Sequence, residues 1–173
     1  MNGDLAAVTG DEAYARHANY GFHAVADKLL WHEEGNDKQG VGAFVRIGAA
    51  SGDRNLAPFY FDTGLNYIGP FKGRDSDILG LAFSFAKISD RARAFDCDFN
   101  IANPSATRPV HDYKAAFELS YSYVAAPWWT IQPGVQYIIH PAGFSADPNA
   151  DATLPAPTMK NALVFGVRTA IQF

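Results

Sequence analysis

The last eleven residues, 163–173, read Leu-Val-Phe-Gly-Val-Arg-Thr-Ala-Ile-Gln-Phe and guide the interpretation of the rest of the chain. One parity is apolar and the other carries Arg168 and Gln172; the apolar positions are Leu163, Phe165, Val167, Ile171 and Phe173. Successive side chains of a β-strand point to opposite faces, so this segment has one oily and one polar face. Its length matches the ~9–11 tilted residues that cross a bilayer as β-structure, and exceeds the ~5–6 residues of a usual soluble strand. The stretch therefore predicts a membrane-spanning strand that closes on an aromatic residue.

The same division between the two parities repeats along the chain. It predicts further strands at Val41–Ala49, Phe59–Tyr67, Leu79–Phe85, Tyr113–Tyr123 and Trp129–Ile139. No odd position in these segments is charged. The charged residues occupy even positions: Arg46, Asp62, Lys114, Glu118 and Arg168.

Tyr20–Trp31 predicts one more strand, the first in chain order, although its two parities do not separate cleanly. We place Asp27 on the polar face and expect Lys28 to snorkel toward the inner rim. Residues 1–19 are expected to be a remnant of an outer loop, and residues 20–173 to be a single domain of strands.

Strand length and aromatic placement decide between a membrane sheet and a soluble one. With the C-terminus on the inner, periplasmic side, the connections 32–40, 68–78 and 125–128 lie on that side, and the longer connections 89–112 and 140–161 lie outside. Aromatic residues then gather near the inner rim, namely Trp31, Tyr67, Phe71, Trp128, Trp129 and Phe173. Short inner turns, long outer loops and aromatic girdles are typical of transmembrane barrels. The predicted fold class is all-β: an antiparallel transmembrane β-barrel wall of about seven strands.

Composition agrees with this class. The 173 residues have a mean hydropathy of −0.12 and contain no uninterrupted apolar run of ~18 residues, so no transmembrane helix is expected. Fifteen Gly, thirteen Phe and eight Tyr suit a β-rich protein. Helical signal is confined to Gly10–Asn19. A net charge of −4 without a basic cluster argues against nucleic-acid binding.

Residues that could carry chemistry are scattered. The five histidines form no tight pair suited to a metal, so no metal or other cofactor is expected. Cys97, the single cysteine, lies between Asp96 and Asp98 and is read as an incidental loop residue. Asp75 and Asp77 lack the spacing of a calcium loop and favour a turn that an Arg–Asp pair anchors.

The loops carry a family resemblance. It rests on Gly48–Asn55, on Gly64–Pro70 with Gly73-Arg74 and Asp77–Gly80, on Ala126–Pro133 with Gln136-Tyr137 and His140-Pro141, and on Asn161–Val164. Together these motifs resemble the C-terminal part of the OprB-type carbohydrate-selective porins. The resemblance implies a sixteen-stranded barrel in the bacterial outer membrane that lets sugars diffuse into the periplasm. It also implies that the C-terminal Phe173 serves insertion by the outer-membrane assembly machinery.

The chain departs from that family in the number of strands. About seven can be read, no signal peptide precedes them, and a row of seven leaves two edges that lipid cannot satisfy. We therefore expect the C-terminal portion of a sixteen-stranded porin barrel, as a fragment or a truncated reading frame. A homo-oligomer that closes the ring is the alternative.

The polar parity supplies candidates for contact with a passing sugar. These pore-lining candidates are Arg46, Tyr60, Asp62, Asn66, Lys114, Glu118, Gln132, Gln136 and Arg168. Arg46 and Arg168 lead, because a guanidinium presents several fixed donors. The competing interpretation pairs these cations with Asp62 and Glu118 as structural ladders across the wall.

Two other classes of protein remain open at this point. A soluble β-sandwich that binds carbohydrate would need protein to cover the odd-parity face. An outer-membrane barrel enzyme could use Ser84, Ser120 or Ser122, although no histidine lies on a strand where it would clearly act as their base. The leading expectation is a passive channel and no enzyme, with sugars and the lipid bilayer as partners.

Overall fold

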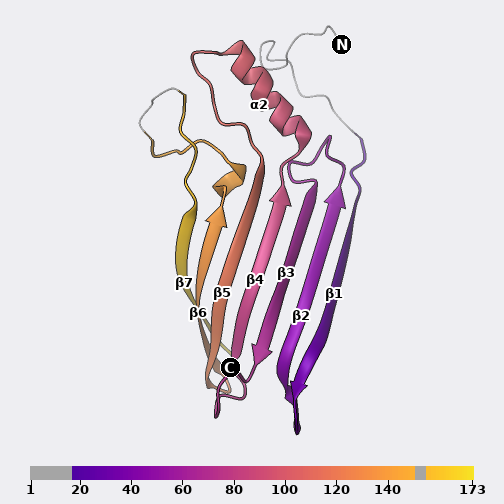
Figure 1. Cartoon of the computed structure of the whole chain (residues 1–173), viewed down its shortest axis with the longest axis vertical. Coiled ribbons are helices and arrows are strands. Elements are labelled where there is room, and N and C mark those ends of the chain that lie inside the picture. The colour runs from indigo at the N-terminus through magenta and orange to yellow at the C-terminus, as the bar shows by residue number, and fades with distance from the viewer. Residues whose placement is uncertain (1–16, 151–154) are drawn as a thin grey trace.

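The computed structural model describes residues 17–150 and 155–173. Its strands form one antiparallel sheet in the order β1-β2-β3-β4-β5-β6-β7, so each strand pairs with its neighbours in sequence. Figure 1 shows a single curved layer with the C-terminus at one end of the strands and helix α2 at the other. The strands are β1 (Gly21–Glu33), β2 (Asn36–Ala50), β3 (Phe59–Ile68), β4 (Ile78–Lys87), β5 (Tyr113–Ala126), β6 (Trp129–Ile139) and β7 (Ala162–Ile171), with helix α2 at Asp90–Ala102 and a short 3₁₀ turn η1 at Pro141–Gly143.

The seven predicted strands are confirmed, with changes at their ends. Strand β2 begins at Asn36, five residues before the predicted start, and β7 ends at Ile171 rather than at Phe173. β7 stops there because its partner β6 begins at Trp129, which pairs with Ile171. The backbone N–H of Gln172 still donates to the Trp128 carbonyl at 2.9 Å.

Strand β1 contains a β-bulge, which explains its mixed parities. The strand pairs in register with β2 as far as Leu29, and the pairing resumes one step out of register at Trp31. Leu30 is the extra residue, so the oily face takes even positions before it and odd positions after it. Asp27 lies on the polar face directly opposite Phe44, as expected.

The sheet has no protein core. Among the described residues, Ile88 and Ala115 are the buried hydrophobic residues, while large apolar side chains on the odd positions of β2–β7 are exposed. A β-sandwich would bury one face of each sheet against the other. The soluble-sandwich interpretation is therefore wrong, since the described strands form a single layer.

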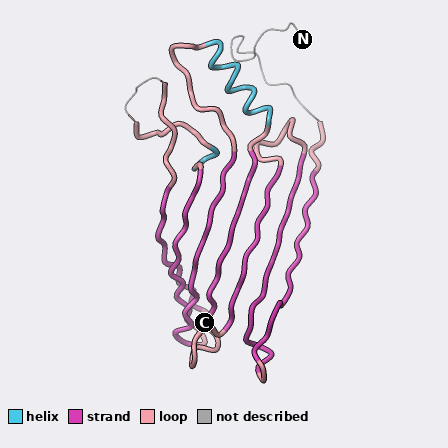
Figure 2. The backbone as a smooth tube through the Cα atoms, in the orientation of Figure 1, coloured by secondary structure: helices cyan, strands magenta, loops and turns pink. Residues whose placement is uncertain are grey.

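The two ends of the sheet differ. The turn end holds the connections 34–35, 69–77 and 127–128 together with the C-terminus, and the loop end holds 51–58, 88–112 and the segment after β6 (Figure 2). Aromatic contacts mark both ends. Ring centroids lie 6.3 Å apart for Trp31 and Tyr67 at the turn end, and 5.5 Å apart for Phe85 and Tyr113 toward the loop end.

Helix α2 was not predicted. Apolar and polar residues are mixed along it and the apolar ones fall on two sides of the helix, so no single apolar stripe stands out in the sequence. Local signals nevertheless explain it: Ser89 is the N-cap and accepts a hydrogen bond from the Ala92 N–H, and Asp90 places negative charge in the first turn. No helix in the described part of the chain combines the length and hydrophobicity that a membrane crossing requires.

Contacts among four side chains link α2 to the neighbouring loops; they are Asp96, Arg108, His111 and Ser145. Asp96 of α2 is buried; it pairs with the guanidinium of Arg108 at 2.9 Å and with His111 Nδ1 at 2.6 Å. The other ring nitrogen of His111 lies 3.1 Å from the Ser145 hydroxyl, which donates to the Ala142 carbonyl at 2.8 Å. The cluster fastens the 88–112 connection to the segment after η1.

The predicted Arg–Asp turn is confirmed at the opposite end. Arg74 contacts both carboxylate oxygens of Asp77, each at 2.7 Å. Asp77 is 1% exposed and also accepts hydrogen bonds from the Tyr121 hydroxyl and, at 2.9 Å, from the Val124 N–H. Burial alone would raise the pKa of the Asp77 carboxyl, but these donors outweigh it and hold the pKa below its usual range.

Candidate functional site: the polar wall of the sheet

The pore-lining candidates all lie on one face, because directly paired residues of neighbouring strands share a face. Register places Arg46 opposite Asp62, Glu118 opposite Gln136, and Gln132 opposite Arg168. Lys114 and Tyr60 share a row through Ala86, and Asn66 reaches Ser120 through Gly80. We call this even-parity face of β2–β7 the polar wall, and the opposite face the oily wall.

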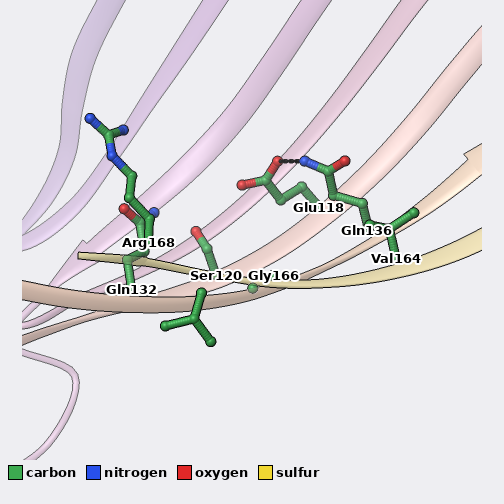
Figure 3. Close-up of a pocket in the computed structure, with 9 residues that line it drawn as sticks. Glu118, Ser120, Gln132, Gln136, Val164, Gly166 and Arg168 are labelled. Atoms are coloured by element: carbon green, nitrogen blue, oxygen red, sulfur yellow. Dashed lines mark hydrogen bonds between the residues drawn. The ribbon is translucent and has the colours of Figure 1, made fainter.

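Two cross-strand pairs organise the polar wall. Arg46 Nε donates to Asp62 Oδ2 at 2.8 Å, with 52% of the Arg46 side chain and 19% of the Asp62 side chain exposed. Gln136 Nε2 donates to Glu118 Oε2 at 2.6 Å (Figure 3). An exposed ion pair contributes about 0–1 kcal/mol to stability. These groups therefore cost little to separate and remain open to a passing solute.

Not every charge on the polar wall is paired. The ladder interpretation is right for Arg46 and Asp62, but Glu118 bonds to Gln136 and not to a cation. Arg168 and Lys114 make no side-chain hydrogen bond or ion pair within residues 17–150 and 155–173. Figure 3 shows the Arg168 side chain extended away from the Glu118–Gln136 pair.

Two adjacent hollows collect most of the candidates. The first is lined by Phe44, Arg46, Asp62, Lys114, Glu118 and Gln136. The second shares Glu118 and Gln136 and adds Ser120, Gln132, Gly166 and Arg168. Tyr60 and Asn66 lie apart from both, Tyr60 beside Gly48 toward the loop end and Asn66 near Gly80.

Sequence reasoning missed Phe44 and left Ser120 outside the pore-lining set. Phe44 was passed over because an apolar ring contradicts the expectation of a wet face. A signal was available: Phe44 occupies an even position of a predicted strand, and in the structure it pairs with the glycine Gly64. Ser120 lines the second hollow and lies opposite Gly134.

The wall offers one kind of chemistry. Carboxylates accept hydrogen bonds, guanidinium groups donate them and amides do both, and these groups lie within a few side chains of one another. In the residues that the structure describes, no three His, Cys, Asp or Glu side chains gather where a metal ion could be held. Such a surface can exchange hydrogen bonds with a hydroxyl-rich solute.

Comparisons with known proteins agree with this geometry. A family model described as "Carbohydrate-selective porin, OprB family" matches residues 2–173. Porin B of Pseudomonas aeruginosa is 25% identical over 156 residues, which cover 87% of this chain and 34% of Porin B. The chain therefore spans about a third of the length of that relative.

A solved structure has the same fold. It is described as the high-pH structure of Pseudomonas putida OprB, and it matches 99% of this chain and 40% of its own chain with a TM-score of 0.86 at 23% identity. OprB porins are outer-membrane proteins, which places this chain in the bacterial outer membrane. With the family model matched from residue 2 to residue 173, the chain belongs to the OprB family of carbohydrate-selective porins.

Proposed function

We propose that this chain forms part of the wall of a passive sugar channel in the bacterial outer membrane, with the polar wall facing the water-filled path. The observation that carries the proposal is the strict sorting of the sheet. Over 41–49, 59–67, 79–85, 113–123, 129–139 and 163–171 the oily wall holds no charged side chain, and Lys87 lies on that face only at the loop end of β4. The polar wall gathers charges of both signs around two hollows.

The transport step needs no nucleophile and no cofactor. Sugars move down their concentration gradient, and selectivity comes from pore width and from the groups that line the path. Arg46 and Asp62 offer a donor and an acceptor 2.8 Å apart, and Arg168 offers a guanidinium with no protein partner in the described chain. Because the lining groups carry charges of both signs, they can hydrogen-bond to sugar hydroxyls without making the channel strongly selective for cations or anions.

The edges of the sheet call for partner strands. β1 and β7 are each paired on one side only, and lipid cannot satisfy the free backbone groups of an edge strand. We propose that further strands close the wall along both edges. A second copy of this chain is one source, and a disulfide between cysteines introduced in β1 and β7 of different copies would identify it.

Phe173 is the proposed contact with the assembly machinery. Its side chain is fully exposed just beyond β7. The Gln172 N–H bond to the Trp128 carbonyl holds the backbone immediately before it. Phe173→Ala is expected to lower the amount of protein inserted in the outer membrane, whereas Gln172→Ala, which keeps that backbone bond, is the matched control.

Liposome swelling tests the channel proposal. The protein is extracted from outer membranes in mild detergent, so that strands bound to its edges are retained, and is reconstituted for swelling in isosmotic glucose. We expect swelling well above that of empty liposomes. Arg168→Ala should slow glucose influx about 2- to 10-fold, which corresponds to one lost hydrogen bond of about 0.5–1.5 kcal/mol.

Phe165→Ala is the matched control, because Phe165 is exposed on the oily wall of the same strand, lines neither hollow and should leave the rate unchanged. Swelling no faster than in empty liposomes would refute the channel. Equal slowing by both substitutions would refute the assignment of Arg168 to the path.

A further inference from the structure

Three consecutive cross-strand pairs on the polar wall of β2 and β3 form a symmetric arrangement. Phe44 pairs with Gly64, Arg46 with Asp62, and Gly48 with Tyr60. The ion pair is thus flanked on both sides by an aromatic residue that faces a glycine. Neighbouring pairs on one face lie two residues apart, or about 7 Å along the strand.

Both aromatic rings lie against the backbone of the facing glycine. A Cβ added at Gly64 would come within 2.6 Å of Phe44 Cε1, and a Cβ added at Gly48 within 2.1 Å of Tyr60 Cε1. Each ring therefore lies against the glycine of the neighbouring strand. Both aromatic residues are half-buried, and each lines a hollow: Phe44 with Arg46 and Asp62, and Tyr60 with Gly48.

The surroundings of Phe44 are polar. The ring shares its hollow with Arg46, Asp62, Lys114 and Glu118. A half-buried apolar ring beside such charged groups gains little from contact with water. A cyclic sugar is complementary to this pattern, since its C–H face is apolar and its edge carries hydroxyls.

We propose that Phe44 and Tyr60 are stacking surfaces for the C–H face of a pyranose, and that the Arg46–Asp62 pair between them bonds to its hydroxyls. The negative face of an aromatic ring attracts the positively polarised C–H groups. The inference deepens the proposed function and rests on it. It adds a substrate class, because a stacking surface favours cyclic sugars over open-chain polyols of similar size.

A simpler role for the rings is to shield the glycine backbone from water, as aromatic residues do beside strand glycines. An apolar side chain without a ring would serve that role nearly as well. Phe44→Leu therefore separates the two roles, because leucine covers Gly64 but has no aromatic face.

The test measures influx of glucose and of sorbitol, an open-chain polyol of similar mass, into liposomes that hold the outer-membrane-extracted protein. We expect Phe44→Leu to lower the glucose-to-sorbitol influx ratio, measured below saturation, about 2- to 10-fold, the range that an aromatic contact of ~0.5–1.5 kcal/mol predicts. Tyr60→Leu should lower the ratio in the same sense. Phe117→Leu is the matched control, because Phe117 is exposed on the oily wall and lines neither hollow, and it should leave the ratio unchanged.

An unchanged ratio in Phe44→Leu would overturn the inference, as would equal slowing of both solutes, because a mere spacer acts on both alike. If Phe44→Leu is not recovered folded, Phe44→Trp keeps a ring over Gly64, and glucose should shift its indole emission relative to wild type. Absence of that shift would also overturn the inference. Failure of the proposed function is distinct: wild-type protein would then admit neither solute.

Discussion

The oily wall and the polar wall are built on the same strands and are both uncovered by protein, yet they carry opposite chemistry. On the oily wall, Phe83 and Phe117 contact each other with ring centroids 4.8 Å apart. On the polar wall, one residue further along β5, Glu118 bonds to Gln136. Since no core among the described residues explains either face, the difference is what the proposed placement predicts, with lipid against the oily wall and water against the polar wall.

Asp77 is a charged residue on the oily side, and its carboxylate is surrounded by hydrogen-bond donors. It directly precedes β4 and continues that strand's odd parity, but it is enclosed by Arg74, the Tyr121 hydroxyl and the Val124 N–H. Arg74 in turn lies 4.0 Å above the ring of Tyr123. Charges on the polar wall have no such enclosure, as the exposed Arg46 shows.

The largest expected effect comes from placing a charge on the wrong wall. Phe165 in the middle of β7 is 76% exposed on the oily wall, so Phe165→Lys should lower the free energy of unfolding from lipid vesicles by about 2–4 kcal/mol. Gly166→Lys moves the same charge one residue along, to the polar wall, where an added Cβ meets nothing within 4 Å. Urea titration should give Gly166→Lys an unfolding free energy close to that of wild type. Equal losses of unfolding free energy in both variants would contradict the distinction between the two walls.

The next effect concerns the enclosed carboxylate. Asp77→Asn removes the charge that Arg74 and Tyr121 surround, and should cost about 2–3 kcal/mol of unfolding free energy at neutral pH. Asp75→Asn, on the exposed part of the same turn, is the control and should cost nothing measurable. A loss as large in Asp75→Asn would place the effect in the turn as a whole.

Lowering the pH should remove the difference in unfolding free energy between wild type and Asp77→Asn. The folded pKa of Asp77 lies below its unfolded value, so its stabilisation is complete above the ordinary carboxyl pKa of about 3.9 and is lost as the pH falls through the folded pKa. The stability gap between wild type and Asp77→Asn should therefore narrow below about pH 3.9. A gap that widens in acid would contradict the assigned direction.

A third prediction concerns steric crowding on the polar wall, where some glycine positions have no room for a larger side chain. A Cβ at Gly64 would lie 2.8 Å from the Leu81 backbone carbonyl oxygen as well as against Phe44, and a backbone atom yields less readily than a side chain. Gly64→Ala should destabilise the protein by about 1–3 kcal/mol. Gly166→Ala, with open space around it, should be neutral or slightly stabilising in the same urea titration.

The smallest effect on stability is expected for the exposed ion pair. Asp62→Asn should change the free energy of unfolding by less than about 1 kcal/mol, while the loss of one negative charge shifts the channel toward anions. The reversal potential across a planar bilayer in a salt gradient measures that shift. Asp90→Asn, in the exposed first turn of α2, is the control charge removal away from the polar wall.

Alternation made the strands predictable because each strand meets lipid on one side and water on the other. That rule fixed β6 at Trp129–Ile139, and it failed in β1, where the bulge at Leu30 changes which parity is oily. A single extra residue in a ladder leaves no clear mark in composition, so β1 could not be sorted from its own sequence.

Other features depend on contacts that alternation does not encode. Helix α2 is held by the Ser89 cap and by Asp96, which finds Arg108 and His111 beyond the helix itself. The pore-lining candidates could be placed on one face from parity. The contact of the Phe44 ring with Gly64 could not, because it depends on the pairing register and on the rotamer of Phe44.

The central claim is that even positions face water and odd positions face lipid, and a cysteine scan along β6 tests it most directly. In a Cys97→Ser background, cysteines at Gln132, Gly134 and Gln136 should react with a charged, membrane-impermeant maleimide. Cysteines at Ile131, Val135 and Tyr137 should resist it, and fluorophores attached there after solubilisation should be quenched by a lipid-borne quencher after reconstitution. Alternating reactivity is the predicted result, and equal reactivity at both parities would contradict the account.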